Sequence, residues 1–135
     1  MKTIPILFTS WYVGLGGGET DLISLVEHLD TDRYSPHLLV PYTGQLSDYW
    51  IEQDWRVHQT NFRGTTTWFI PKIWEQFPVV NRIENTLREN KIQAIHCDYH
   101  TLPMVLPAAK NLNIPVMWTC WGWWFKPKFW QHDFF

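Results

Sequence analysis

Short apolar runs alternate along the chain with segments whose apolar residues recur at helical spacing. Residues 3–9 form a nearly continuous apolar run ended by a glycine cluster, as is typical of a central strand buried on both faces. Pro5 removes one ladder donor, so we expect the strand to become regular only from Ile6. Over residues 19–29 the apolar positions fall on one helical face, which predicts a helix directly after the glycines.

The same alternation continues toward the C-terminal tail. It predicts further strands over residues 36–42, 55–58, 92–97 and 114–119. It also predicts helices over residues 46–53, 70–89 and 102–112, with a polar loop at 61–67. Pro78 disfavours a helical conformation at Phe77, so the second of these helices should be interrupted and regular only over 79–89. Pro103 and Pro107 should start or break the third.

Strands that alternate with helices in this way indicate an α/β fold. The 135 residues lie in the usual size range of one domain, and no repeat or low-complexity linker divides them. We therefore expect a single domain over 1–135, built as a Rossmann-like, doubly wound parallel sheet with helices on both faces.

Composition narrows the class of protein. The chain is 45% hydrophobic and 18% charged with a net charge of −2, which excludes a disordered polymer and leaves no basic footprint for nucleic acid. No window approaches the roughly 18 apolar residues that a membrane-spanning helix requires. Cys97 and Cys120 are the two cysteines, which is not the density of a secreted disulfide scaffold. A reducing, cytoplasmic location fits best, and it argues against a bond between these two strand-end thiols.

The most informative motif is the glycine-rich turn at Gly16, Gly17 and Gly18, between the first strand and the first helix. Glycines permit positive φ and leave backbone N–H groups uncovered, and the helix N-terminus adds partial positive charge. Such a turn suits a nucleotide diphosphate. Glu19 and Asp21 would repel a phosphate unless their side chains point elsewhere. The alternative is a turn that only lets the helix pack tightly on the strand, since neither the G-x-G-x-x-G fingerprint nor the P-loop lysine is present.

A second candidate site follows the fourth strand. Ligands bind outside the carboxyl ends of the strands in open α/β sheets, where His96, Asp98 and His100 are candidate catalytic or hydroxyl-binding groups and Tyr99 a lining residue. Along an extended chain His96 and Asp98 point to one side and Cys97 to the other, so we expect no metal site. Alternatively, His96 is a satisfied, partly buried histidine and only Asp98 and His100 reach the cleft.

Several motifs, taken in order, resemble glycosyltransferase family 4. The run Ile6-Leu7-Phe8, then Gly17-Gly18-Glu19 and an amphipathic helix, resembles the opening of these enzymes, and 93–97 and 113–119 resemble their fourth and fifth strands. The resemblance covers nearly all of the chain and implies a GT-B fold. It further implies that the glycine loop faces the diphosphate of a nucleotide-sugar donor at an interdomain cleft, and that this half shapes the acceptor site without a metal or other cofactor.

The resemblance implies the N-terminal, acceptor-side half of a retaining glycosyltransferase. In the family, the base, the ribose and much of the donor sugar are held by a second domain, including a pair of glutamates, and these 135 residues contain none of it. We therefore expect the chain to be inactive alone. The alternative is a stand-alone nucleotide- or sugar-binding module or adaptor without catalysis. One departure is Trp121-Gly122, where the family frequently has His-Gly; Trp121 cannot exchange protons but can stack on a sugar or line the cleft.

The C-terminal tail is unusually aromatic, because nine of the 18 residues from Trp118 to Phe135 are Trp or Phe. Three interpretations stay open. The rings stack on a sugar acceptor, or, with Lys126 and Lys128 between them, they touch the headgroup region of a membrane that carries a lipid-linked acceptor. In the third interpretation they pack against the missing C-terminal domain.

Overall fold

The computed structural model describes residues 2–62 and 73–119, with only the backbone described for 73–77. Strands and helices alternate along these residues. The strands are β1 (Ile4–Thr9), β2 (Tyr34–Val40), β3 (Arg56–Gln59), β4 (Ala94–Cys97) and β5 (Val116–Trp118). The helices are α1 (Gly17–Glu27), α2 (Gln45–Glu52), α3 (Ile73–Glu89) and α4 (Leu102–Asn111).

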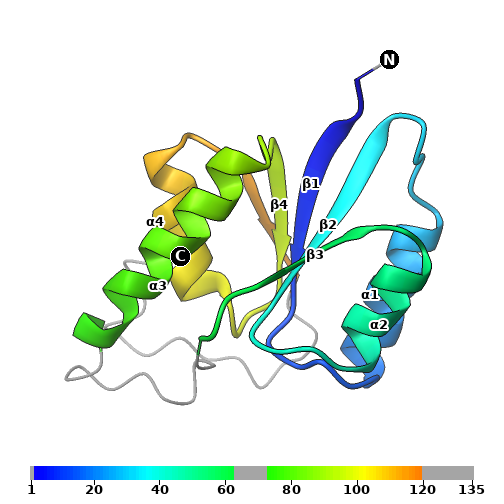
Figure 1. Cartoon of the computed structure of the whole chain (residues 1–135), viewed down its shortest axis with the longest axis horizontal. Helices are drawn as coiled ribbons and strands as arrows, with labels where there is room; N and C mark the ends of the chain where they lie inside the picture. The colour runs from blue at the N-terminus through cyan, green and yellow to red at the C-terminus, as the bar shows by residue number, and fades with distance from the viewer. Residues whose placement is uncertain (1, 63–72, 120–135) are drawn as a thin grey trace.

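The five strands form one parallel sheet in the order β3-β2-β1-β4-β5. Helices α1 and α2 cover one face, and α3 and α4 cover the other (Figure 1). This confirms the predicted Rossmann-like, doubly wound fold. The strand order reverses between β1 and β4, so the crevice for ligands is expected at the carboxyl ends of these two strands.

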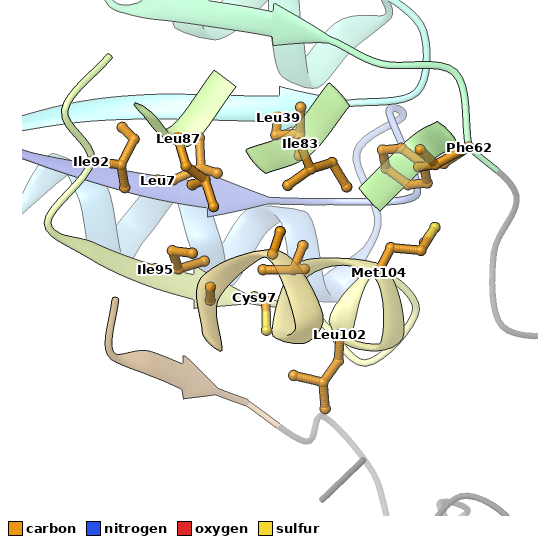
Figure 2. Packing of buried hydrophobic residues seen from close by; sticks show 14 residues of the cluster. Leu7, Leu39, Phe62, Ile83, Leu87, Ile92, Ile95, Cys97, Leu102 and Met104 are labelled. Atoms are coloured by element: carbon orange, nitrogen blue, oxygen red, sulfur yellow. The ribbon is translucent and has the colours of Figure 1, made fainter. Parts of the chain in front are cut away.

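The core is divided by the sheet because successive strand residues point to opposite faces. Leu7 packs with Ile83, Leu87 and Ile95 in the layer under α3 and α4, as Figure 2 shows. The next residue, Phe8, points to the other layer, whose buried members are Val13, Leu22, Val26, Leu38, Val40, Leu46 and Trp50. Each fully buried side chain of this size stabilises the fold by about 1.5–3 kcal/mol. At Leu7 and Phe8, β1 is therefore buried on both faces.

The expectation that β1 becomes regular only from Ile6 was wrong. The strand begins at Ile4, whose N–H donates to the carbonyl of Arg33 at 2.9 Å. The Pro5 carbonyl instead accepts from Gln93 at 3.0 Å, on the side of β4. Because N–H and C=O of one strand residue point the same way, the missing donor of Pro5 falls where pairing with β4 has not yet started.

The predicted interruption by Pro78 of the helix at 70–89 was also wrong, since α3 is continuous from Ile73 to Glu89. Pro78 and Pro107 are each the sixth residue of their helix. The first four N–H groups of a helix have no acceptor in it, so each proline costs only one internal hydrogen bond just beyond the first turn. Pro103 lies in the first turn of α4, where no donor is needed.

Three helices end in the same backbone motif. Asp54, Lys91 and Asn113 have φ of 61°, 54° and 55°, in the left-handed region. Each lies two residues beyond the end of α2, α3 or α4, and the next residue donates back to the helix, as Trp55 does to Trp50 at 3.0 Å. These are Schellman caps built without glycine. The hydrogen bonds of the caps satisfy carbonyl groups at the helix ends, and this offsets the backbone strain of the positive φ.

Candidate functional site

The glycine-rich turn connects β1 to α1 at the switch in strand order. None of the described glycines has a positive φ, so the turn does not use the conformational freedom that glycines permit. The glycines instead allow close approach. A Cβ on Gly14 would lie 2.6 Å from the Tyr12 hydroxyl oxygen, and one on Gly16 would lie 2.8 Å from Oε2 of Glu19. A Cβ on Gly17 would meet nothing within 4 Å.

Glu19 bends back over the turn. Its Oε2 accepts the N–H of Gly16 at 3.2 Å, and its Oε1 lies 3.3 Å from Oγ of Ser10. The carboxylate thus takes one of the donors at the helix N-terminus, as a capping side chain does. No acceptor for the N–H groups of Gly17 and Gly18 lies among residues 2–62 and 73–119. These two donors are the part of the turn that an anion can use.

Asp98 links the loops that follow β1 and β4. Its carboxylate accepts the N–H of Thr101 at 3.2 Å and of Trp11 at 3.4 Å, and also a short hydrogen bond from the Thr101 hydroxyl. Burial raises the pKa of Asp98, while the hydrogen bonds from Thr101 and the nearby His100 act in the opposite direction. The Asp98 carboxylate therefore connects two loops at the crevice through hydrogen bonds and does not project into the crevice.

His96 lies apart from this crevice. Its side chain is 6% exposed, its ring packs 5.7 Å from that of Phe8, and Nε2 is 2.7 Å from the Thr119 hydroxyl oxygen. Desolvation lowers its pKa, which favours the neutral ring. It lines an apolar cavity of about 380 Å³ on the α1 face of the sheet, with Leu25 and Met117 at its walls. Its position matches the alternative expectation of a satisfied, buried histidine.

His100 and Tyr99 lie beside the loop after β1. The His100 ring centroid is 5.2 Å from that of Trp11 and 5.1 Å from that of Tyr99. Both side chains are partly buried. His100 therefore shares with Asp98 a contact to Trp11, at the same edge of the sheet as the glycine turn.

The structure thus brings together Asp98, Tyr99, His100 and the loop that leads to the glycines, and it separates His96 from them. Cys120, Trp121 and Gly122 lie outside the described residues. Within the part of the chain that the structure describes, no three His, Cys, Asp or Glu side chains are grouped as a metal site requires. None of the helices described there is long and apolar enough to cross a membrane.

Sequence reasoning missed three residues of this edge. Thr101 had a usable signal, because Asp98 and Thr101 stand three apart directly before a helix, the spacing of an N-terminal cap. No sequence signal pointed to Trp11 or Tyr12. Their roles depend on Asp98, 87 residues away from Trp11, and on the path of the turn.

A parallel sheet of this order, with a glycine turn and polar loops at its switch point, defines a Rossmann-like α/β domain. Residues 15–134 match the model of Glycosyltransferase Family 4, and the chain belongs to this family. This confirms the resemblance that the sequence motifs indicated. No match to the chain was found among curated proteins.

Solved structures share the fold at low sequence identity. A glycosyltransferase from Rickettsia africae ESF-5 superposes with a TM-score of 0.78 at 15% identity, over 99% of this chain and 34% of that one. MurG of Acinetobacter baumannii gives 0.63 at 17%, over 87% and 34%. Alr3699/HepE of Anabaena, in complex with UDP-glucose, gives 0.61 at 19%, over 85% and 28%. The chain spans about a third of the length of these proteins and corresponds to their N-terminal GT-B domains.

Proposed function

We propose that this chain is the acceptor-side half of a retaining glycosyltransferase that moves a sugar from a nucleotide-sugar donor to an acceptor. The observation that carries the proposal is the pair of open N–H groups at Gly17 and Gly18, placed at the strand-order switch of a family 4 domain. HepE, which shares the fold, was solved with UDP-glucose, with UDP and glucose, and with UDP. That supports a nucleotide sugar as the class of donor.

The diphosphate binds at the start of α1 in this proposal. Gly17 and Gly18 donate their N–H groups, and the helix N-terminus favours the negative charge. Gly16 shapes the turn, and its own N–H becomes available only when Glu19 swings away. No metal or other cofactor is needed for these contacts.

The acceptor lies on the other side of the crevice. Tyr99, His100, Trp121 and Gly122 line it, and a sugar or lipid-linked hydroxyl is the group to be glycosylated. Among the three catalytic candidates, His100 is the best placed to exchange a proton at this edge. Asp98 is held by Trp11 and Thr101, and His96 lies under α1, so both act at most indirectly.

The chain alone has no transferase activity in this proposal, because the family's donor-binding glutamates belong to a second domain. The aromatic tail packs against that domain. A cytoplasmic location agrees with Cys97, a free, buried thiol whose pKa is raised by desolvation.

Amide NMR of the 15N-labelled chain tests the donor site. Titration with UDP and GDP at millimolar concentration should shift the amide signals of Gly17 and Gly18. Gly17→Val should abolish these shifts, because its side chain fills the open space at the turn. Ser24→Val, at an exposed position of the same helix, is the matched control and should leave them unchanged. Equal shifts in both variants would show that the turn does not bind the diphosphate and only allows the helix to pack on the strand.

Transfer itself needs a separate assay. Turnover of a nucleotide sugar by the purified chain would overturn the proposed dependence on a second domain. If a longer protein that contains this domain binds nucleotides but gives no turnover with any acceptor, the alternative of a binding module is correct.

A further inference from the structure

The ring of Tyr12 lies across the glycine turn. The atoms nearest to a Cβ built on Gly14 are Oη, Cζ and Cε1 of Tyr12, at 2.6, 2.7 and 2.9 Å. A Cβ on Gly16 would lie 3.7 Å from the same Cε1. One edge of the phenol therefore rests on the backbone between these glycines, while 49% of the residue stays exposed.

The backbone under this ring is held from both sides. Oγ of Ser10 donates to the carbonyl of Tyr12 at 2.7 Å. The next residue, Val13, is buried, and its carbonyl accepts the N–H of Leu46 at 2.9 Å. Gly44 packs so closely there that a Cβ would lie 2.7 Å from Cγ2 of Val13. The ring is thus presented to solvent from a fixed segment, which lowers the entropic cost of using it in binding.

We infer that Tyr12 is the aromatic wall on which the sugar ring of a nucleotide-sugar donor stacks. The inference rests on the proposed diphosphate site at Gly17 and Gly18. The sugar of such a donor is bonded directly to the diphosphate, whereas the base is separated from it by the ribose. The Tyr12 ring, whose Cε1 lies 3.7 Å from a Cβ built on Gly16, is therefore nearer to the two units bonded to the diphosphate, the sugar and the ribose, than to the base. The apolar C–H face of a hexose suits an exposed aromatic ring, and the phenol hydroxyl adds a hydrogen-bonding group.

Two features distinguish this ring from an aromatic residue of the core. A core aromatic would be buried, as Phe8 and Trp50 are in the layer below. The glycines at 14 and 16 also leave room for the edge of the ring at the turn, and a Cβ built on Gly17 would meet no atom of the ring within 4 Å. The turn is thereby shaped to carry a ring and an anion next to each other.

Fluorine NMR on the chain labelled with 3-fluorotyrosine tests the inference. The probes are UDP-glucose and GDP-mannose, each compared with its nucleoside diphosphate. The Tyr12 signal, assigned with Tyr12→Phe, should shift with either nucleotide sugar and stay in place with UDP or GDP. Tyr34, at the opposite end of the sheet, serves as an internal reference.

Affinity measurements complete the test. Tyr12→Leu should weaken binding of the responsive nucleotide sugar about five-fold and leave that of its nucleoside diphosphate unchanged, while Tyr12→Phe stays within about two-fold. Gly14→Ala keeps the phenol but pushes it off the turn, and it should weaken the same ligand. Tyr42→Leu is the matched control, because this tyrosine is 51% exposed at the same edge of the sheet but is not among the atoms nearest to Gly14 or Gly16.

The outcomes separate the inference from the proposed function. If the amide signals of Gly17 and Gly18 shift with UDP but the fluorine signal of Tyr12 does not shift with a nucleotide sugar, the diphosphate site stands and the inference fails. An equal Tyr12 shift with UDP alone assigns the ring to the nucleotide and also overturns it. If neither the amides nor Tyr12 respond, the diphosphate site and the inference fail together. Should Tyr12→Leu not fold, the fluorine shifts of the wild-type chain decide.

Discussion

The carboxylate of Asp98 accepts the backbone N–H of Trp11 at 3.4 Å, across 87 residues of sequence. This contact joins the loop after β1, which leads into the glycine turn, to the loop after β4, which carries His100. The two loops flank the point where the strand order reverses. Asp98 therefore fixes the relative position of the proposed donor and acceptor sides.

Removing the Asp98 carboxylate should destabilise the domain. In Asp98→Ala the N–H groups of Trp11 and Thr101 lose their acceptor, and each unsatisfied buried donor costs about 1–3 kcal/mol. We expect the free energy of unfolding in urea to fall by about 2 kcal/mol in total, since water replaces part of the loss. Asp98→Asn, which keeps one acceptor oxygen, should lose less. Equal stability of Asp98→Ala and the wild type would show that the tie contributes nothing.

Two histidines on β2 and β3 should make the fold sensitive to acid. Nδ1 of His37 lies 2.9 Å from Nε2 of His58, and the rings stack at a centroid distance of 5.2 Å. Desolvation, with His58 and Arg56 adding to it, lowers the pKa of His37 from 6.5 to about 4, and desolvation and Arg56 also lower that of His58. Between these pH values the unfolded chain binds the proton and the folded chain does not. The contribution of the neutral histidines to stability is therefore fully present above pH 6.5, and it is lost as the pH falls toward 4.

At 1.36 kcal/mol per pKa unit, the full loss for His37 is at most about 3.4 kcal/mol, of which about 2 kcal/mol falls between pH 6.5 and pH 5. Urea unfolding at pH 7.5 and pH 5 measures this second part. His37→Phe should flatten the difference between the two pH values, whereas His28→Gln, at an exposed position that follows α1, should leave it intact. A His37→Phe protein that loses as much stability in acid as the wild type contradicts the assignment to this pair.

Alanine at Gly17 and Gly44 should have opposite effects on stability. Gly17 has open space at its Cβ position and lies in a helix, so Gly17→Ala should leave stability unchanged or raise it by up to about 0.5–1 kcal/mol. At Gly44 a Cβ would lie 2.8 Å from the carbonyl oxygen of Val13, and this backbone atom cannot move aside. Gly44→Ala should therefore cost about 1–3 kcal/mol. Thermal unfolding of both variants decides, and a stable Gly44→Ala protein would refute the close packing.

Glycine at Lys91 should stabilise the domain. Lys91 holds a φ of 54° beyond the end of α3, a conformation that costs a residue with a Cβ roughly 1–2 kcal/mol. Lys91→Gly relieves this strain, and we expect about 1 kcal/mol more stability, because glycine also loses more chain entropy on folding. Lys91→Ala removes the charge but keeps the strain, so it is the control. If both variants show the same change in urea, the side chain and not the backbone explains the effect.

The pattern of apolar residues determined the order of elements and hence the fold class. A buried strand and an amphipathic helix differ in the spacing of their apolar residues, and this local signal survives without any knowledge of neighbours. It placed each strand and helix within a few residues of its observed bounds. The family motifs lie on these same elements, so the sequence also identified the family. The predictions at Pro5 and Pro78 were wrong, because the cost of one missing hydrogen bond depends on where the proline lies within a packed element.

Tertiary structure alone decided which polar groups meet. That Glu19 closes on Gly16, that Asp98 holds Trp11, and that His96 turns away from the crevice all depend on the register of β1 against β4 and on the path of the turn. Contacts between residues far apart in the chain are set by the packing of whole elements, and no local pattern records them. The sequence thus determined which residues could form a site, and the fold selected those that face one another.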